Sequence, residues 1–459
     1  MIGLFSTSVA QKGLPAGKIK QNVLLPMPMK VDGTQLATSV TLDSNWRWWH
    51  NKDGYDNCFA GDWVQKYCPD PLKCAENCVV EGVPAEDWKR PYGASVAGNA
   101  LTLNYVTQGE YGQNVGSRVY LMDPNGKDYQ GFDLRNREFS FTVDVSKLPC
   151  GLNGALYFVE MPLNTGRADI SSAYGVNYGD AQCPKDIKYI GGWANTNSSG
   201  ACSNEMDIWE ANSMATAFTP HTCSNIGVKA CTKADECGDG GSRYKGWCDK
   251  DGADYNPYRH GDKTLYGPGP NFRVDTTKAF QVITQFITHN NKDDGDLVRI
   301  KRLYSQNGKL IEGGELSDDI IAGYKAKFKE TNHFAQLGGM KGMGQSFARK
   351  MVLVLSIWDD SSPARMKWLD ATYPVGSAEP GAVRGPCPVD SGDPSVLRRQ
   401  VPDSHVIYSD IQVNRLPTPS PTPSPTLSPA PSPAPSPTPS PTPSTPAAGF
   451  WKCTQCVPM

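Results

Sequence analysis

Three carboxylate side chains lie within six residues of one another in the segment Glu205-Met206-Asp207-Ile208-Trp209-Glu210. Ionised carboxylates repel one another and are costly to bury, so their crowding beside Ile208 and Trp209 points to a chemical role. Two carboxyl groups held at short range can act as a nucleophile and a general acid–base on one bond. This segment is therefore the first candidate for a reactive site.

The spacing of the three carboxylates is informative if the segment is a β-strand. Glu205 and Asp207 then share one face, and a single β-bulge between Asp207 and Glu210 would turn Glu210 to the same side. The Cα atoms of Glu205 and Glu210 would lie roughly 13 Å apart and their carboxyl groups about 5–6 Å apart. This matches the roughly 5–5.5 Å separation of a retaining glycoside hydrolase, whereas a helix would make the two glutamates diverge by about 140°. Taken alone, such a string is more often a solvated edge or a cation site.

Composition narrows the possible partners and the class of protein. The chain has 459 residues, a net charge of −2 and 20% charged residues, which argues against nucleic acid or an anionic membrane as a partner. Apolar runs stay well short of the ~20 residues of a transmembrane helix. The 45 glycines, 11 tryptophans and 19 tyrosines are typical of a loop-rich β protein with exposed aromatic surfaces.

The 14 cysteines fall mostly into tight clusters, one at residues 58–78 and another at 223–248. Zinc is the alternative ligand, but pairs spaced C-x-x-C with histidine partners are missing there, so disulfides and secretion are predicted. Residues 1–10 end in Ser8-Val9-Ala10, which resembles a signal-peptidase site without the basic start. Residues 1–20 are therefore expected to be a signal-peptide remnant and an N-terminal arm; the alternative is an ordinary disordered N-terminus.

Strand-like runs recur along the chain and are separated by Gly, Pro, Asn and Asp. Asn125-Gly126 and Asn307-Gly308 predict tight turns, and residues 318–329 are the best candidate for a helix. This pattern predicts an all-β fold, an antiparallel sandwich with long loops. The predicted strands cover residues 100–106, 118–122, 138–145, 155–161, 279–287, 297–303, 350–358 and 405–413.

The chain divides by composition near residue 416. Residues 417–446 consist almost wholly of Pro, Ser and Thr, which predicts a semi-rigid linker with a reach on the order of 90 Å. Residues 21–416 are expected to form the catalytic domain. The short tail, 447–459, contains Cys453 and Cys456 and is either a truncated binding-module stub or an unstructured end.

With the carboxylate segment as a guide, the chain resembles glycoside hydrolase family 7 over about residues 26–413. This is a family of secreted cellulases that includes reducing-end cellobiohydrolases and endoglucanases. Its members have a β-jelly-roll, or concanavalin-like, sandwich in which two curved antiparallel sheets and long loops form a cleft or tunnel. The resemblance rests on Asn45-Trp46-Arg47-Trp48, residues 148–157 and 205–212, Thr219-Pro220-His221, Asn256-Pro257-Tyr258-Arg259, Tyr266-Gly267-Pro268-Gly269, and residues 356–360 and 380–385.

The resemblance implies a role for each residue of the carboxylate segment. Glu205 is expected to be the nucleophile, Glu210 the acid/base and Asp207 the residue that holds Glu205, with His221 beside Glu210. Glu210 must then start protonated and Glu205 ionised; a neighbouring carboxylate would raise the pKa of Glu210. A structural histidine is the alternative interpretation of His221. Neither a metal nor an organic cofactor is implied.

The resemblance also implies a substrate path. Trp46 and Trp48 would share a strand face as sugar platforms toward the cleft entrance, with Trp358 just before the scissile bond and Trp368 just beyond it. Any one of these tryptophans would otherwise be read as a core residue. The remaining expected contacts are Asn153, Tyr157, Tyr178, Asp180 and Gln182 near the scissile bond, and Arg259 and Arg384 on the product side.

Family pairing of the cysteines implies six disulfides and leaves none of the cysteines before the linker unpaired. Four further family bridges are absent, each at both ends; one such pair of positions holds Gly179 and Ser203. The implied bridges are Cys58–Cys78, Cys68–Cys74, Cys150–Cys387, Cys183–Cys202, Cys223–Cys248 and Cys231–Cys237.

One departure from the family concerns the loop over the glycone side. Residues 193–201 are roughly a dozen fewer than in the cellobiohydrolase roof, which is typical of an endoglucanase. The loop at 238–247 and the loop at 380–385 are nearly full length. A monomeric, secreted reducing-end cellobiohydrolase with a partly open tunnel is therefore expected, acting on cellulose or related β-1,4-glucans. The alternatives are an endoglucanase of the same family and, more distantly, a non-catalytic lectin-like sandwich that binds calcium.

Overall fold

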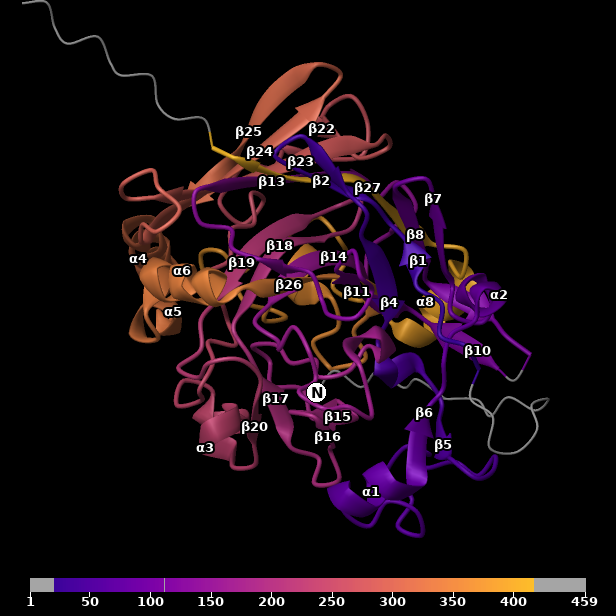
Figure 1. Cartoon of the computed structure of the whole chain (residues 1–459). Coiled ribbons are helices and arrows are strands. Elements are labelled where there is room, and N and C mark those ends of the chain that lie inside the picture. The colour runs from indigo at the N-terminus through magenta and orange to yellow at the C-terminus, as the bar shows by residue number, and fades with distance from the viewer. Residues whose placement is uncertain (1–19, 111, 417–459) are drawn as a thin grey trace, which may run out of the picture. The chain divides into compact units, whose positions relative to one another are not determined.

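The computed structural model describes residues 20–110 and 112–416, in which two large sheets pack face to face (Figure 1). We call them the cleft sheet and the outer sheet. In spatial order the cleft sheet contains β1 (Leu25–Pro26), β4 (Ser39–Leu42), β11 (Ser117–Met122), β26 (Met351–Asp359), β14 (Leu152–Val159), β18 (Glu205–Ala211) and β19 (Thr216–His221), with β12 (Gly131–Phe132) paired to β26.

The outer sheet is antiparallel apart from the pairing of its β2 with β27. Its strands are β25 (Lys309–Leu316), β24 (Leu297–Gln306), β23 (Phe280–Thr288), β13 (Arg137–Asp144), β27 (His405–Arg415), β2 (Met29–Val31) and β3 (Thr34–Leu36), extended by β8 (Ala100–Asn104) and β7 (Ala94–Ala97).

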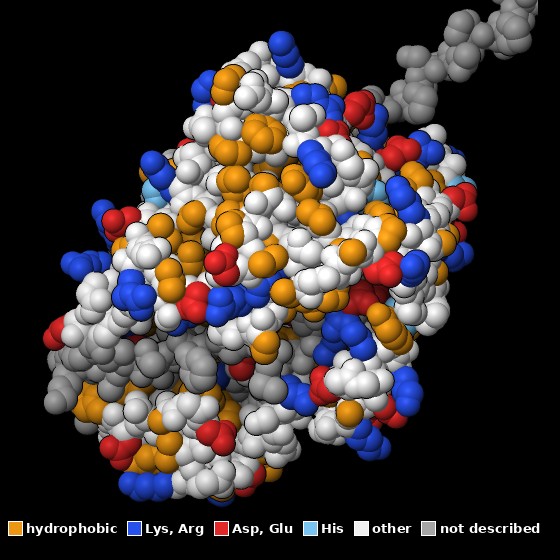
Figure 2. All heavy atoms as spheres, turned by 180° about the vertical axis from the view of Figure 1, so that it is seen from behind, with side chains coloured by type: hydrophobic (Ala, Val, Ile, Leu, Met, Phe, Trp, Pro, Cys, Tyr) orange, Lys and Arg blue, Asp and Glu red, His pale blue; other side chains and the backbone are white. Residues whose placement is uncertain are grey.

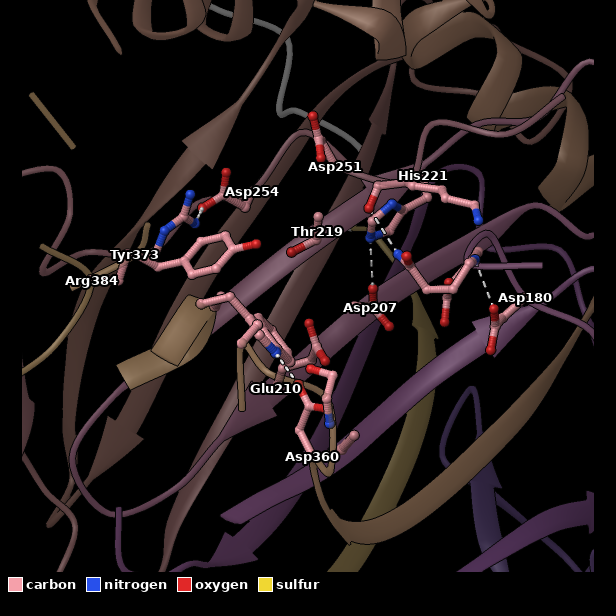
Figure 3. Close-up of a pocket in the computed structure, with 18 of the residues that line it drawn as sticks. Asp180, Asp207, Glu210, Thr219, His221, Asp251, Asp254, Asp360, Tyr373 and Arg384 are labelled. Carbon is pink, nitrogen blue, oxygen red and sulfur yellow. Dashed lines mark hydrogen bonds and ion pairs between the residues drawn. The ribbon is translucent and has the colours of Figure 1, made fainter. Parts of the chain in front are cut away.

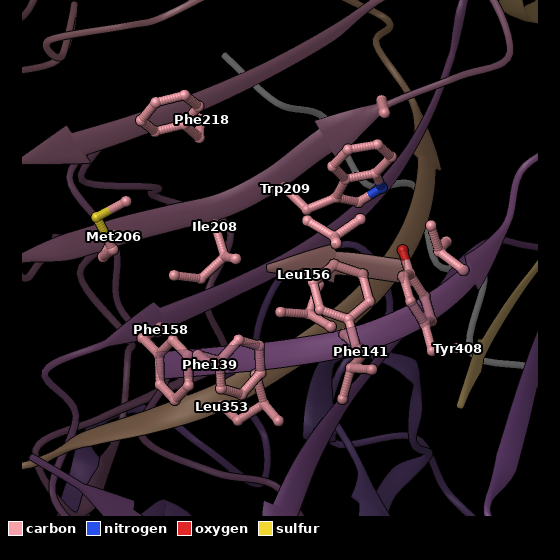
Figure 4. Close-up of a cluster of buried hydrophobic side chains, with 14 of the residues drawn as sticks. Phe139, Phe141, Leu156, Phe158, Met206, Ile208, Trp209, Phe218, Leu353 and Tyr408 are labelled. Atoms are coloured by element: carbon pink, nitrogen blue, oxygen red, sulfur yellow. The ribbon is translucent and has the colours of Figure 1, made fainter. Parts of the chain in front are cut away.

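The core lies between the two sheets because alternate residues of each strand point inward (Figure 4). Phe158 of β14 packs on Phe139 of β13 with ring centroids 5.1 Å apart, and Trp209 of β18 lies 6.2 Å from Phe141. Both edge-to-face contacts have the geometry that aromatic pairs prefer. Burying a side chain of this size contributes about 1.5–3 kcal/mol. The predicted antiparallel sandwich is confirmed.

Short elements form the loops around the sheets. The helices are α1 (Pro71–Asn77), α2 (Ala85–Lys89), α3 (Ala234–Cys237), α4 (Asp318–Phe328), α5 (His333–Gln336), α6 (Gly339–Arg349), α7 (Lys367–Asp370) and α8 (Pro394–Gln400), with 3₁₀ turns η1 (Ser44–Trp46), η2 (Ser172–Tyr174) and η3 (Gly240–Ser242). The minor strands are β5 (Trp49–Asn51), β6 (Cys78–Val80), β9 (Val106–Gln108), β10 (Gln113–Val115), β15 (Tyr189–Ile190), β16 (Trp193–Ala194), β17 (Gly200–Cys202), β20 (Lys229–Cys231), β21 (Tyr266–Gly267) and β22 (Val274–Asp275).

All eight predicted strands correspond to strands of the two sheets, and the predicted helix is α4. Asn307 and Gly308 join β24 to β25 with φ of 53° and 73°, as a type I′ hairpin turn requires. Gly126 has φ of 64° in the turn that follows β11. Ser317 caps α4 by accepting a hydrogen bond from the Ile320 amide.

The prediction that Trp46 and Trp48 share a strand face is wrong. Trp46 ends the 3₁₀ turn η1, which forms because the Asp43 carboxylate accepts a hydrogen bond from the Asn45 amide at 2.6 Å. Trp48 follows the turn and is 3% exposed. Its indole stacks on the His50 ring at 4.2 Å. The turn rotates the backbone between the two tryptophans, so the period of two residues does not apply.

Six disulfides join the cysteines that the structure describes, in the pairing implied by the family resemblance. Cys183–Cys202 and Cys223–Cys248 lie on either side of β18 in sequence. Cys150–Cys387 joins residues 237 positions apart. The other three are Cys58–Cys78, Cys68–Cys74 and Cys231–Cys237.

The expected signal-peptide remnant, residue 111, the linker and the tail with Cys453 and Cys456 lie outside the described residues, except for Lys20, so the domain boundaries stay predictions. Within the described residues, the helices are too short or too polar to cross a membrane. On the face opposite to that in Figure 1, acidic and basic side chains are interspersed with hydrophobic ones (Figure 2).

Candidate active site

A β-bulge in β18 brings the three carboxylates to one side. Glu205 pairs with His221 and Asp207 with Thr219, but Glu210 pairs with Ala217, so the register shifts between Asp207 and Glu210. Ile208 and Trp209, inside the bulge, are both fully buried in the core. The bulge predicted from the sequence is confirmed, and with it the common face of Glu205, Asp207 and Glu210.

These carboxylates line a cavity of about 900 Å³ on the cleft sheet (Figure 3). Most of the predicted site residues also line it. They are Trp46, Tyr157, Tyr178, Asp180, Gln182, Glu205, Asp207, Glu210, His221, Trp358, Trp368 and Arg384. Trp48, Asn153 and Arg259 do not.

Glu205 and Asp207 are held from two directions. The Ala181 amide donates a hydrogen bond to Glu205 Oε2 at 3.0 Å, and His221 Nε2 lies 3.1 Å from Asp207 Oδ2. The other nitrogen of His221, Nδ1, lies 2.6 Å from the Asp249 carbonyl oxygen. Because a carbonyl can only accept, Nδ1 carries a proton, and Nε2 is left to face Asp207.

Burial dominates the electrostatics of the carboxylate pair. It raises the pKa of Glu205 well above the ordinary value, and the charges of Asp207 and Asp180 raise it further. Burial likewise raises the pKa of Asp207, with Glu210 and Asp180 adding to the effect. Two adjacent buried carboxylates cannot both ionise at low cost, so the pair shares one proton. When Asp207 carries this proton, its O–H donates a hydrogen bond to Glu205, and Glu205 is the charged member of the pair.

Glu210 is a separate acid. Burial raises its pKa to about 7, with His221 and Asn153 opposing this rise. Asn153 Nδ2 donates to Glu210 Oε1 at 2.9 Å, while Asn153 Oδ1 accepts from the Ala211 amide at 3.0 Å. Asn153 was expected to contact sugar; its side chain is fully buried and holds Glu210 instead.

Aromatic rings form two parts of the cavity wall. Trp358 and Trp368 stack at 6.1 Å with an interplanar angle of 26°, and Trp368 Nε1 donates to Asp360 at 3.3 Å. Trp46 Nε1 donates to the Gly116 carbonyl at 2.9 Å, which fixes the indole in the wall. Flat apolar rings suit the C–H face of a sugar.

A line of hydrogen bonds runs beside Glu205. The Tyr157 and Tyr178 hydroxyls lie 3.0 Å apart, and Tyr178 donates to Asp180 Oδ2 at 2.7 Å. The Gln182 amide donates to Asp180 Oδ1 at 2.8 Å. These residues were predicted as sugar contacts, and their side chains lie beside the reactive carboxylates.

A network of ion pairs forms the opposite end of the cavity. Arg384 pairs with Asp254 at 3.2 Å and faces the cavity (Figure 3). Arg259 pairs with Asp254 and Glu330, but its side chain is 1% exposed, so it supports the wall rather than lining it. Burial alone would raise the pKa of Asp254; the charges of Arg259 and Arg384 hold it well below its usual value.

Several cavity residues were not predicted from the sequence. Asp251, Asp254 and Asp360 lie within or beside the recognised motifs, and their nearness to these motifs was the available signal. Lys325 and Glu330 belong to α4 and the loop after it, where nothing in the sequence pattern marks them. The cavity also includes Thr219, Tyr244 and Tyr373.

Glu205, Asp207 and His221 each offer a ligand atom within 4.8 Å of the others, a spacing compatible with a metal ion. Their contacts have another explanation, since Glu205 already accepts the Ala181 amide and Asp207 faces an imidazole nitrogen. A shared proton satisfies the same set of atoms.

Comparison with known proteins agrees with this site. The family model described as Glycosyl hydrolase family 7 matches residues 29–418. The chain is 44% identical over 446 residues to an exoglucanase, GH7B, of Limnoria quadripunctata, an alignment covering 90% of this chain and 97% of that one.

Two solved structures resemble this chain in both fold and sequence. A family 7 cellobiohydrolase from Daphnia pulex has a TM-score of 0.84 at 41% identity, with 87% of this chain and 98% of that one covered. An endocellulase, EGI, of Humicola insolens has a TM-score of 0.74 at 32% identity, with 86% and 98% covered. Such identity over such coverage reaches well beyond a shared fold, and the chain therefore belongs to glycosyl hydrolase family 7.

Proposed function

We propose that the protein is a cellulase that hydrolyses β-1,4-glucosidic bonds with retention of configuration. The observation that carries this proposal is the bulge in β18, which turns Glu205, Asp207 and Glu210 into one cavity. The cavity walls also include the aromatic rings of Trp46, Trp358 and Trp368. The relatives named as an exoglucanase and a cellobiohydrolase support the same substrate class.

The first step forms a glycosyl-enzyme ester. The Glu205 carboxylate attacks the anomeric carbon, the bond to the leaving oxygen breaks, and Glu210 gives its proton to that oxygen. Asp207 holds the Glu205 carboxylate by its shared proton, and His221 orients Asp207. The pKa of about 7 lets Glu210 keep its proton in weakly acidic solution.

The second step restores the enzyme. Glu210, now ionised, takes a proton from water while the water oxygen attacks the anomeric carbon. The ester bond to Glu205 breaks, and the Glu205 carboxylate is released. The anomeric carbon is substituted twice, each time with inversion, so the product keeps the original β configuration.

Within the family we favour a reducing-end cellobiohydrolase with a partly open tunnel. Arg384, Asp254 and Glu330 form a charged wall at one end, suited to the hydroxyls of a released disaccharide. The higher TM-score with the Daphnia cellobiohydrolase than with the Humicola endocellulase supports this assignment. The short roof at residues 193–201 favours the alternative, an endoglucanase.

We further propose that the protein is secreted and monomeric and binds neither nucleic acid nor membranes. Six disulfides are expected of an oxidising compartment. The net charge of −2 and the mixed charges in Figure 2 give no electrostatic attraction for nucleic acid.

The test is hydrolysis of crystalline cellulose and cellohexaose, with early products followed by proton NMR. We expect cellobiose as the main product and the β-anomer first; an α-anomer would refute the retaining mechanism. Glu205→Gln should abolish hydrolysis of every substrate. A calcium-dependent lectin would instead bind sugar without cleaving it and release it in EDTA.

A further inference from the structure

Asp249 and His333 form a second pair of a carboxylate and an imidazole, next to the Nδ1 side of His221. The Asp249 carbonyl accepts the His221 Nδ1–H, and the Asp249 amide donates to the Thr222 carbonyl at 2.9 Å. The Cys223–Cys248 disulfide fixes the same two segments side by side. The backbone of Asp249 is therefore the part of the fold that decides which nitrogen of His221 carries hydrogen.

The side chain of Asp249 points to His333. Asp249 Oδ1 lies 3.9 Å from His333 Nδ1, and the two side chains are 2% and 4% exposed. Asp249 Oδ2 and His333 Nδ1 have no hydrogen-bond partner among the described residues. Leaving two buried polar groups unpaired costs free energy when they face each other. A small rotation of the Asp249 or His333 side chain that closes the 3.9 Å gap is therefore favourable.

His333 is itself held in place. It is the first residue of α5, whose cap Asn332 accepts a hydrogen bond from the Ala335 amide. Thr222 Oγ1, next to His221, donates to the Phe334 carbonyl at 3.2 Å. The Tyr244 ring, which lines the cavity, meets the His333 ring edge to face at 5.9 Å.

The charges around Asp249 come from several elements. His221 of β19, Lys325 of α4 and His333 of α5 are its positive or protonatable neighbours, and Asp251 is its acidic one. Lys325 forms an ion pair with Glu330 at 3.2 Å. Burial raises the pKa of Asp249, and the three basic neighbours oppose this rise. His221 and Lys325 lower this pKa more than His333 does, but His333 is the neighbour whose ring nitrogen faces the Asp249 carboxylate, at 3.9 Å.

We propose that His333 is a positioning residue for His221: through the Asp249 side chain it holds the carbonyl that fixes the His221 tautomer, and so sets the pH range in which the Glu205–Asp207 pair works. The inference rests on the proposed catalytic role of that pair. With its Nδ1–H on the Asp249 carbonyl, His221 keeps Nε2 toward Asp207, and the negative charge of an ionised Asp249 favours the proton that the Glu205–Asp207 pair shares. Without His333, Asp249 is a buried carboxylate without this partner and takes up a proton.

The kinetic test compares His333→Phe and His333→Gln with the unmodified protein on cellotetraose across the pH range. We expect His333→Phe to lower kcat about threefold or more and to move the alkaline limb of kcat/KM down by about half a pH unit, with KM little changed. The amide of His333→Gln can still donate to Asp249, so it should restore most of kcat. His405→Phe, at a histidine of β27 outside the cavity, is the matched control and should change neither quantity.

The second readout is the ¹⁵N NMR signal of the His221 ring, recorded in the Glu205→Gln background. We expect one Nδ1–H tautomer when His333 is present and a mixture in His333→Phe. An unchanged tautomer and pH profile in folded His333→Phe would overturn the proposal. If that variant does not fold, Asp249→Asn should give the same shift, and an unchanged profile there would overturn it equally. The tautomer needs no turnover, so failure of the proposed function would not hide the answer.

Discussion

At the residue scale, burial rather than a neighbouring carboxylate is the largest cause of the raised pKa of Glu210. The predicted direction of the shift is confirmed, and the neighbouring carboxylates Asp254 and Asp180 do contribute to it, but burial contributes more. Desolvation comes first, while His221 and the Asn153 amide oppose it. Burial depends on strands distant in sequence, so it could not be read from the carboxylate segment itself.

This balance makes a prediction for Asn153→Ala. The Asn153 amide favours ionised Glu210, so its loss should raise the pKa of Glu210 further above about 7. Glu210 then keeps its proton to higher pH, so the alkaline limb of the kcat/KM profile with cellotetraose should move to higher pH. We expect kcat to fall about tenfold because Glu210 also loses its orientation. A limb that moves to lower pH would contradict this role of Asn153.

Gly252 gives a second prediction at this scale. Its φ is 70°, and a Cβ there would lie 2.3 Å from Thr219 Cγ2 and 2.5 Å from His221 Cε1. Gly252→Ala should therefore push the His221 ring away from Asp207 and reduce kcat about tenfold or more. Gly308→Ala is the matched control, with φ of 73° and nothing within 4 Å of the added carbon.

In thermal unfolding, Gly308→Ala should lose about 1–2 kcal/mol of stability from the strained backbone, and Gly252→Ala should lose more because its Cβ also clashes with Thr219 and His221. Cellotetraose hydrolysis should fall in Gly252→Ala alone. Equal activity in the two variants would show that the position of the His221 ring does not matter.

At the element scale, the strands and the bulge were predictable because each depends on residues close together in the sequence. Alternating residues located the strands, and three carboxylates at unequal spacing required the bulge. Trp48 and Arg259 were misplaced because their exposure is decided by tertiary packing. A 3₁₀ turn separates Trp48 from Trp46, and Asp254 and Glu330 enclose Arg259.

The short roof between β16 and β17 makes the prediction that belongs to this scale. Removing part of a roof opens a second exit and lets internal chain segments enter sideways. Relative to a fully roofed family member, we expect more internal cuts per cellobiose released. The measurement is viscosity loss of carboxymethylcellulose against reducing ends formed. A steep viscosity drop with little cellobiose would make the protein an endoglucanase.

At the scale of the whole molecule, the buried carboxyl groups act together on stability. Burial raises the pKa of Glu205, Asp207, Asp180 and Asp249, and raises that of Asp370 to about 6. The sequence showed these residues as acidic but could not show that the fold buries them. The fold therefore keeps protons on carboxyl groups in its interior at pH values where the unfolded chain has released them.

The consequence for stability follows from proton linkage. Between about pH 4.5 and 7 the native state keeps protons that the unfolded chain has released, so the free energy of unfolding falls as pH rises. Below about pH 4 the opposite holds for Asp254, whose pKa the ion pairs lower. We therefore expect the melting temperature to be highest near pH 4–5 and lower at pH 8, as calorimetry can measure.

Glu205→Gln separates this effect from the rest of the surface charge. It removes one buried ionisable group while keeping its shape, so the fall in melting temperature between pH 5 and 8 should become shallower. Glu86→Gln, on the exposed face of α2, changes the formal charge equally and should leave the slope unchanged. If both variants retain the full slope, the buried carboxylates do not control stability, because proton uptake at Glu205 would then be the same in the folded and unfolded chains.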